Sequence, residues 1–156
     1  METSDLRAAY DRFLRTALSS ADCEAADDAG WTVAMVVAHV AANDRLIAAH
    51  LRRAMAGEAT AYDNRTVYRA SELQPLVDAD SDVRSQIDDA RRSSSDVLAL
   101  AGQIDEGVAA LVFQTNIMDG DIVQLDGPVP LAGLLGAQVR VHLPLHTAQI
   151  EALAGA

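Results

Sequence analysis

Cysteine is almost absent from this chain of 156 residues, because Cys23 is the only one. A single cysteine excludes an internal disulfide and a zinc site built from cysteine pairs, and we expect a reducing cytoplasm as the location. Cys23 lies in an acidic stretch with no neighbouring cation in the sequence to lower the pKa of its thiol. We therefore expect no catalytic thiolate there.

Basic residues are also scarce, with 12 lysines and arginines against 23 acidic residues and a net charge of -11. Such a surface repels polyanions, so nucleic acid is not an expected partner. The chain has no apolar run long enough to cross a bilayer, and its first residues lack a basic region followed by an apolar run. We expect neither a membrane span nor an export signal.

Aromatic residues make up only 4% of the chain, although half of the residues are hydrophobic. Alanine, leucine and valine dominate, and this mixture favours closely packed helices over a sandwich of strands. The length fits one domain, so residues 1–156 are predicted to form a single helical domain.

Apolar residues recur at helical spacing in four segments. Ser4 is placed to cap the first helix, Gly57 to end the second, and Pro130 to begin the last. Pro144 should kink the last helix because it has no amide hydrogen for the hydrogen-bond ladder. The four predicted helices span residues 5–20, 33–56, 81–103 and 131–154.

Two connections complete the predicted fold. Residues 58–80 are polar and contain a proline, which indicates a long crossing loop with one helical turn near residues 71–77. Residues 111–117 and 121–126 are rich in strand formers and flank the turn signal Asp119-Gly120. The prediction is an all-α four-helix bundle with a long crossing loop and a small β-hairpin before the last helix.

Three histidines are the candidate metal ligands. His142 and His146 are four residues apart in the last predicted helix, so both imidazoles leave the same face one turn apart. His39 lies inside an apolar helical run, where a buried ring needs a partner for its nitrogens. His50 is about 16 Å further along that helix, too far to join the same ion, and we expect a solvated or interface position for it.

Three neutral imidazoles leave coordination positions open, as in a catalytic rather than a structural metal site. Such ligands suit zinc, nickel, copper or iron, and ligand type alone does not choose among them. Zinc and nickel are the first candidates. Asn43 and Gln149, each about one turn beyond a histidine, could reach a metal-bound water or orient a ligand. Arg45 and Arg140 are candidate anion anchors, although the histidines and these polar residues could equally be ordinary bundle contacts.

Two further clusters have simpler explanations. The aspartates at 78, 80, 82 and 89 resemble a calcium loop, but valine replaces its glycine and an aspartate its final glutamate. Capping of the third helix explains them better. Residues 93–96 have no nucleophile-elbow glycines, so we expect solvated helix surface rather than a hydrolase serine.

The segment from Trp31 to Val40, the predicted hairpin ahead of residues 128–131, and the segment from His142 to Ile150 resemble the DinB-like superfamily. This superfamily includes the N-terminal domain of mycothiol-dependent maleylpyruvate isomerase. The resemblance implies a four-helix bundle, often dimeric, in which one histidine of the second helix and two residues of the last helix bind a divalent metal ion.

Carried over by motif, the ligands that the resemblance implies are His39, His142 and His146. Characterised members include that isomerase and S-transferases that use mycothiol, bacillithiol or glutathione. Isomerase-type members usually have a carboxylate at the position of His142, and this difference weighs against isomerisation itself.

Three functions remain open from the sequence. The leading hypothesis is a metal-dependent transferase that activates a low-molecular-weight thiol for attack on a small electrophile. The alternatives are a non-enzymatic metal- or ligand-binding protein of the stress response and a metal-dependent hydrolase. The sequence identifies no general base, and whether the chain is an enzyme stays open.

Overall fold

Helices form most of the structure, a computed structural model that describes residues 3–58, 61–67, 70–79, 82–119 and 122–155. The helices are α1 (Ser4–Ser19), α2 (Val33–Met55), α3 (Ala70–Ala79), α4 (Val83–Gln103), α5 (Glu106–Ala109), α6 (Leu131–Ala137) and α7 (Leu143–Ala154). The strands are β1 (Tyr62–Asp63), β2 (Val112–Asp119) and β3 (Ile122–Pro130). A 3-10 turn, η1 (Arg65–Val67), follows β1. A π-helical turn, η2 (Gln138–His142), joins α6 to α7.

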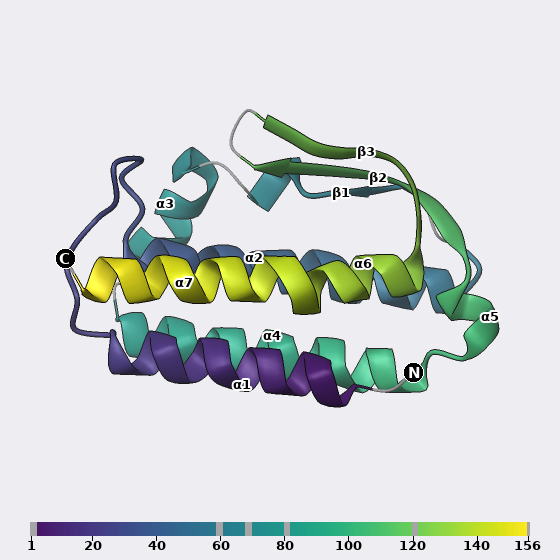
Figure 1. The fold of residues 1–156 in the computed structure, drawn as a ribbon, viewed down its shortest axis with the longest axis horizontal. Coiled ribbons are helices and arrows are strands. Elements are labelled where there is room, and N and C mark those ends of the chain that lie inside the picture. Colours follow the sequence, from purple (N-terminus) through teal and green to yellow (C-terminus); the bar gives the residue numbers. More distant parts are fainter. Residues whose placement is uncertain (1–2, 59–60, 68–69, 80–81, 120–121, 156) are drawn as a thin grey trace.

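The long helices lie side by side, and α2 packs on α4 while α1 packs on α7 (Figure 1). Their inward faces form one core, in which Phe13, Leu51, Val97, Leu143 and Ile150 are 0% exposed. This burial follows the helical spacing of apolar residues and confirms the predicted mainly helical bundle with a small β element. None of the described helices is long and apolar enough to cross a membrane.

The helix ends follow local capping chemistry. Thr32 caps α2 by accepting a hydrogen bond from the amide of Met35, and Asp82 caps α4 by accepting one from the amide of Arg84. The capping role preferred for the aspartates is thus confirmed at Asp82. The predicted cap at Ser4 is wrong, because Ser4 is the first helical residue and Thr3 precedes it.

The last helix runs through Pro144 without ending there (Figure 1). Just before the proline, the amide of Leu143 donates to the carbonyl of Gln138, five residues earlier, which makes the π-helical turn η2. Such a turn accommodates one extra residue and is common at functional sites. The helix therefore tolerates the missing amide of Pro144 while His142 and His146 stay on one face.

The predicted hairpin is present and longer than expected, with β2 and β3 antiparallel from the pair Val112–Pro130 to the pair Asp119–Ile122. The turn residue Gly120 lies outside the described residues. A bulge between Ile117 and Met118 shifts the register. The sheet covers the side of the bundle formed by α2 and α6 (Figure 1).

The crossing loop is more ordered than predicted. Its two-residue strand β1 pairs in parallel with β2, with Tyr62 opposite Thr115, which makes a three-stranded sheet in the order β1-β2-β3. The expected single helical turn is the ten-residue helix α3, which contains Pro75. The helical turn predicted near residues 71–77 is therefore present as a longer helix, whereas strand β1 was not predicted.

Candidate metal centre

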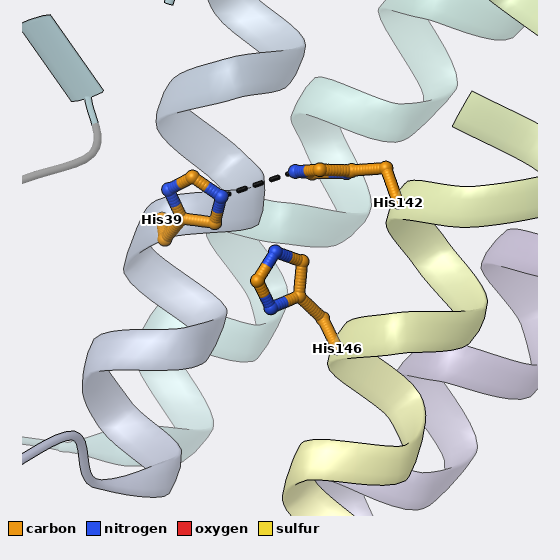
Figure 2. Close-up of side chains that lie close together, drawn as sticks. All are labelled: His39, His142 and His146. Atoms are coloured by element: carbon orange, nitrogen blue, oxygen red, sulfur yellow. Dashed lines mark hydrogen bonds between the residues drawn. The ribbon is translucent and has the colours of Figure 1, made fainter. Parts of the chain in front are cut away.

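The three predicted ligands lie together between α2 and the last helix. His39 projects from the middle of α2, His142 from the end of η2, and His146 from the next turn in α7, and their rings point toward one another (Figure 2). The ring centroids are 5.2 Å (His39 to His142), 4.7 Å (His39 to His146) and 4.6 Å (His142 to His146) apart. One nitrogen from each ring lies within 4.8 Å of the other two.

The ring orientations fit ligation of a divalent metal ion. The Nδ1–H of His39 donates to the carbonyl oxygen of Val67 at 2.7 Å. The Nε2 of the neutral ring is therefore unprotonated, and it is directed at the cluster. That Nε2 is 3.0 Å from Nε2 of His142. Two nitrogens on a tetrahedral zinc ion would be about 3.4 Å apart, so a small shift would place both on one metal.

Burial keeps two of these rings neutral, which is the form that binds metals. Burial, with a smaller contribution from the charge of His146, lowers the pKa of His39 to about 3. Burial also lowers the pKa of His142 well below its ordinary value, helped by His146 and His39. The Nδ1 of His142 is buried with no hydrogen-bond partner in the described structure. At neutral pH His39 and His142 therefore offer uncharged nitrogen donors.

His146 is held by a chain of hydrogen bonds that ends on a carboxylate. Its Nδ1 is 3.0 Å from Oε1 of Gln149, and Nε2 of Gln149 donates to Asp27 at 2.9 Å. Asp27 also accepts from the backbone amides of Ala29 and Trp31. Burial pushes the pKa of Asp27 up, but these hydrogen bonds outweigh it and leave the pKa below its ordinary value.

The sequence prediction for Gln149 and the structure agree on position, since its amide contacts a candidate ligand. Asp27 was missed by sequence reasoning. Its signal was the run Asp27-Asp28-Ala29-Gly30, because an aspartate at the start of a turn often accepts a hydrogen bond from the amide two residues later.

Two hollows flank the histidines. One of about 430 Å³ lies between them and the hairpin, with Leu125 on its far wall. The other, of about 480 Å³, is lined by Asp27, Trp31 and His146. The Trp31 ring stacks on His146 with centroids 6.5 Å apart and meets His39 edge-on at 5.5 Å. Small molecules could therefore approach the histidines without displacing the bundle core.

The family model of the mycothiol maleylpyruvate isomerase N-terminal domain matches residues 4–125, which is most of the chain. The chain belongs to this family. The resemblance inferred from the sequence is thereby confirmed. The matched part holds His39, whereas His142 and His146 lie beyond it.

One solved structure, the crystal structure of the mycothiol-dependent maleylpyruvate isomerase, is similar to this member of the family with a TM-score of 0.69 and 16% sequence identity. The match covers 94% of this chain and 58% of that one, so this chain spans less than two thirds of that relative. At this identity the likeness shows a shared fold. No curated protein matches the chain.

In this family member, Asn43 belongs to a buried polar network beside the histidines. Its Oδ1 accepts from the hydroxyl of Tyr62 at 2.7 Å, and its Nδ2 donates to Gln138 at 3.4 Å. Gln138 in turn donates to Asp44 at 3.1 Å. Asp44 also accepts a hydrogen bond from the hydroxyl of Tyr10 at 2.6 Å. Burial raises the pKa of Asp44 to about 7. The network links the bundle core to the wall of the hairpin-side hollow.

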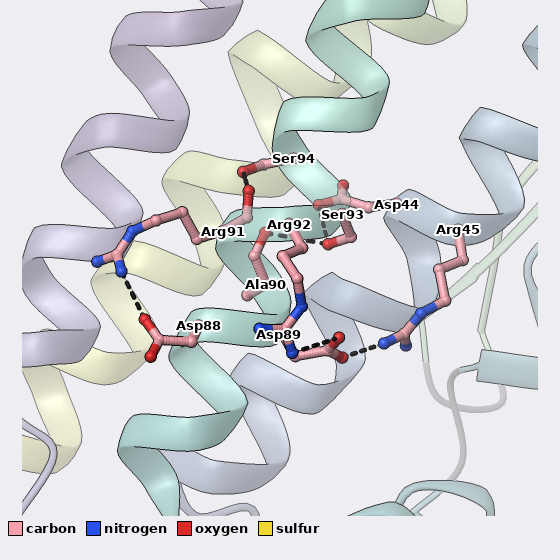
Figure 3. Close-up of polar contacts among 9 residues, drawn as sticks. All are labelled: Asp44, Arg45, Asp88, Asp89, Ala90, Arg91, Arg92, Ser93 and Ser94. Carbon is pink, nitrogen blue, oxygen red and sulfur yellow. Dashed lines mark hydrogen bonds and ion pairs between the residues drawn. The ribbon is translucent and has the colours of Figure 1, made fainter.

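Ser93 contributes to the same network. The Ser93 hydroxyl lies 3.1 Å from Oδ2 of Asp44 and 3.0 Å from the carbonyl of Ala90 (Figure 3). Ser93 and Ser94 are 9% and 3% exposed. The prediction of solvated surface is therefore wrong for these two serines, because their small hydroxyls bond to their own helix or to Asp44 and so can be buried.

Neither arginine proposed as an anion anchor lines the two hollows described above. Arg45 forms an ion pair with Asp89 on α4 (Figure 3). The guanidinium of Arg140 lies over Gly136, so close that a β-carbon there would clash with it. Both side chains make other contacts in this structure, and their role as anion anchors stays a prediction.

His50 is buried, at 5% exposed, and the prediction of a solvated or interface position is wrong. Its ring lies edge-on against Tyr62 and Phe113, with centroids 5.7 Å and 4.8 Å away. It does not join the three-histidine cluster, as the sequence predicted. Its Nε2 has no hydrogen-bond partner in the described structure.

Replacing His50 with leucine is expected to raise the free energy of unfolding by about 1 kcal/mol at pH 7.5, because a buried polar atom without a partner is removed. Burial and then the charge of Arg53 lower the pKa of His50 below 6.5. The native state therefore resists its protonation, and the wild type loses stability as the pH falls below about 6.5. Urea unfolding at pH 7.5 and 5.5 should show the gain from His50→Leu growing with acidity.

His50→Gln provides the control for this titration, since it keeps a polar side chain that does not ionise. It should lose the part of the pH dependence that His50 contributes, without the gain at pH 7.5. A leucine variant whose advantage shrinks at pH 5.5 would contradict the expectation.

Proposed function

We propose that this chain is a metal-dependent transferase that joins a low-molecular-weight thiol to a small electrophile. The observation that carries the proposal is the convergence of three imidazole nitrogens within 4.8 Å at the end of a cavity. Three protein ligands leave positions open for a further ligand, as in catalytic zinc sites. When bound there, a divalent ion such as zinc or nickel would lower the pKa of a thiol that coordinates it.

The chain's own residues would prepare this site in two ways. Val67 and Gln149 fix the rings of His39 and His146 so that each presents a nitrogen to the same point. His142 is neutral, whereas a carboxylate ligand would cancel one unit of the ion's charge. A set of three imidazoles therefore favours binding and ionisation of a thiol more strongly than a set with a carboxylate.

The thiol is proposed from the family. The similar solved structure is that of a mycothiol-dependent enzyme, and the matching family model carries mycothiol in its description. Mycothiol is therefore the first thiol to test. The predicted cytoplasmic location and homodimer stay predictions.

The test is thiol conjugation to monochlorobimane, which becomes fluorescent when its chlorine is displaced by sulfur. Mycothiol, bacillithiol, glutathione and cysteine are compared with protein as purified, after chelation, and after reloading with zinc or nickel. We expect at least one thiol to react about a hundredfold faster than without protein, and chelation to remove this gain. No acceleration with any thiol in any metal state would refute the transferase, and turnover of an ester without thiol would favour the hydrolase.

Gln149→Leu is expected to weaken metal binding by about 10- to 100-fold, because the partner that orients the ring of His146 is lost. The dissociation constant is measured by competition with a coloured chelator. Gln103→Leu is the matched control, since Gln103 is exposed on α4 and bonds only to the carbonyl of Ala99 on its own helix. An unchanged dissociation constant in Gln149→Leu would show that Gln149 does not support the ligand.

A further inference from the structure

The hollow between the histidines and the hairpin has a mostly apolar wall. Ile117 and Met118 of β2 and Leu125 of β3 face it from the sheet, while Val141 and Leu145 face it from the last helix. Val141 is 60% exposed and Leu145 51% exposed, although both are large apolar side chains. Apolar side chains left open beside a cavity are typical of a surface that a ligand covers.

Apart from the three histidines at its end, the polar groups of the hollow are neutral. Asn43, Asn64, Gln124 and Gln138 contribute amides, and Tyr62 contributes a hydroxyl. Burial raises the pKa of Tyr62 well above its ordinary value, so its hydroxyl stays protonated. Amides and a hydroxyl can match a carbonyl or hydroxyl group of a ligand, but they cannot neutralise a charge.

Charged side chains are missing from this wall. Among the described residues that line the hollow there is no lysine, arginine, aspartate or glutamate, although 22% of the chain is charged. Three arginines lie within two residues of the lining in sequence and make other contacts, Arg45 with Asp89, Arg65 with Asp63 and Arg140 over Gly136. A carboxylate in the hollow would lose water without gaining a lysine or arginine as partner, and the net charge of -11 adds long-range repulsion.

We propose that this hollow binds an uncharged, largely apolar molecule with a carbonyl or similar neutral polar group, and discriminates against carboxylates of the same size. In the proposed thiol transfer this molecule is the electrophile, and to that extent the inference rests on the proposed function. The preference itself is a property of the hollow and is measured without thiol or turnover.

The test compares two unreactive ligands of equal size, 4-phenyl-2-butanone and 3-phenylpropanoate. The ketone has a methyl group where the carboxylate has its charged oxygen. Titration calorimetry is done with the full chain as purified and again after chelation, because a carboxylate can also coordinate a metal ion. We expect the ketone to bind at least about tenfold more tightly to the chelated, metal-free protein, in which only the wall of the hollow acts on the ligand. Equal binding or tighter carboxylate binding in the chelated protein, or no ketone binding at millimolar concentration, would overturn the proposal.

Matched variants locate the preference in this hollow. Gln124→Arg places a cation on its wall and should tighten carboxylate binding about tenfold. Val123→Arg adds the same charge to the neighbouring residue of β3, which is 55% exposed and is not part of this wall, and should leave the ratio unchanged. An equal effect of both variants would mean that the ligands bind elsewhere and would overturn the proposal.

The two proposals fail separately. Selective ketone binding without any thiol transfer would refute the proposed transferase and leave the neutral-ligand hollow in place. Thiol transfer together with tight binding of 3-phenylpropanoate would support the transferase and refute the preference of the hollow for neutral ligands.

Discussion

Replacing His39 with alanine is expected to lower metal content from near one equivalent to almost none. The metal site would then keep only His142 and His146, which lie on one helix face and cannot surround an ion. Structural zinc sites bind with about 10–16 kcal/mol in total, so one ligand of three or four accounts for a loss of a hundredfold or more in affinity. His146→Ala should have the same effect. Elemental analysis of protein purified without an affinity tag measures the content directly.

His50→Leu is the matched control for these variants, because it removes a buried histidine of the same helix α2 that lies outside the cluster. It should keep its metal. Trp31, the only tryptophan, stacks on His146 and meets His39, so its fluorescence should be quenched by nickel in the wild type and much less in His39→Ala. Circular dichroism shows whether each variant is folded.

Two results would contradict this assignment. One is His39→Ala protein that is folded and still carries a full equivalent of metal. The other is native protein that is folded, metal-free and unable to take up added zinc or nickel, which would favour the non-enzymatic alternative.

The long helices could be predicted from the sequence because their pattern is local. The spacing of apolar residues predicted helices at 33–56 and 81–103, and the structure has Val33–Met55 and Val83–Gln103. The hairpin was also predictable, since two runs of strand formers flank Asp119-Gly120. In each case the residues that determine the helix or hairpin lie within that helix or hairpin.

Elements held by distant partners could not be predicted. Strand β1 has two residues, and its pairing with β2 depends on a segment more than 50 residues later, with Asp63 opposite Asn116. Helix α3 contains Pro75 within a polar stretch, which by itself favours a loop. Its Leu73 is 0% exposed, so packing against the bundle provides the stabilisation that the local sequence lacks.

The same distinction applies to the site. The spacing of His142 and His146 is local, so the sequence predicted that both lie on one helix face. The burial of His39 was predictable from its apolar neighbours. The partners of these residues were not visible: Val67 is 28 residues from His39, and Asp27 is 122 residues from Gln149. Hydrogen bonds of this kind depend on the tertiary fold, and the sequence gives no spacing rule for them.

Asp44→Asn is expected to stabilise the protein by about 4 kcal/mol more at pH 8 than at pH 4. Burial raises the pKa of Asp44 from 3.8 to about 7, so the native state binds this proton more tightly than the unfolded state does. The stability that comes from protonated Asp44 is complete below about pH 4 and is lost as the pH rises to about 7. A shift of about three units corresponds to about 4 kcal/mol, and asparagine, which does not ionise, avoids this loss.

The surroundings of Asp44 suit a neutral group at this position. With the hydroxyl of Ser93 donating to Ala90, its oxygen can accept a hydrogen bond from a protonated Asp44 or from the amide of an asparagine. The oxygen of either side chain can still accept from Tyr10 and Gln138. Asparagine should therefore preserve the network, so the difference from wild type reports mainly the charge.

Urea unfolding of wild type and Asp44→Asn between pH 4 and pH 8 measures this difference, and the histidines, common to both proteins, cancel in the comparison. Asp89→Asn is the matched control, because Asp89 is partly exposed and pairs with Arg45 and Arg92; its difference from wild type should change by less than about 1 kcal/mol over the same range. A constant difference for Asp44→Asn would mean that Asp44 stays ionised in the folded protein throughout this range. In that case the hydrogen bonds from Tyr10, Gln138 and Ser93 would offset the cost of burying its charge.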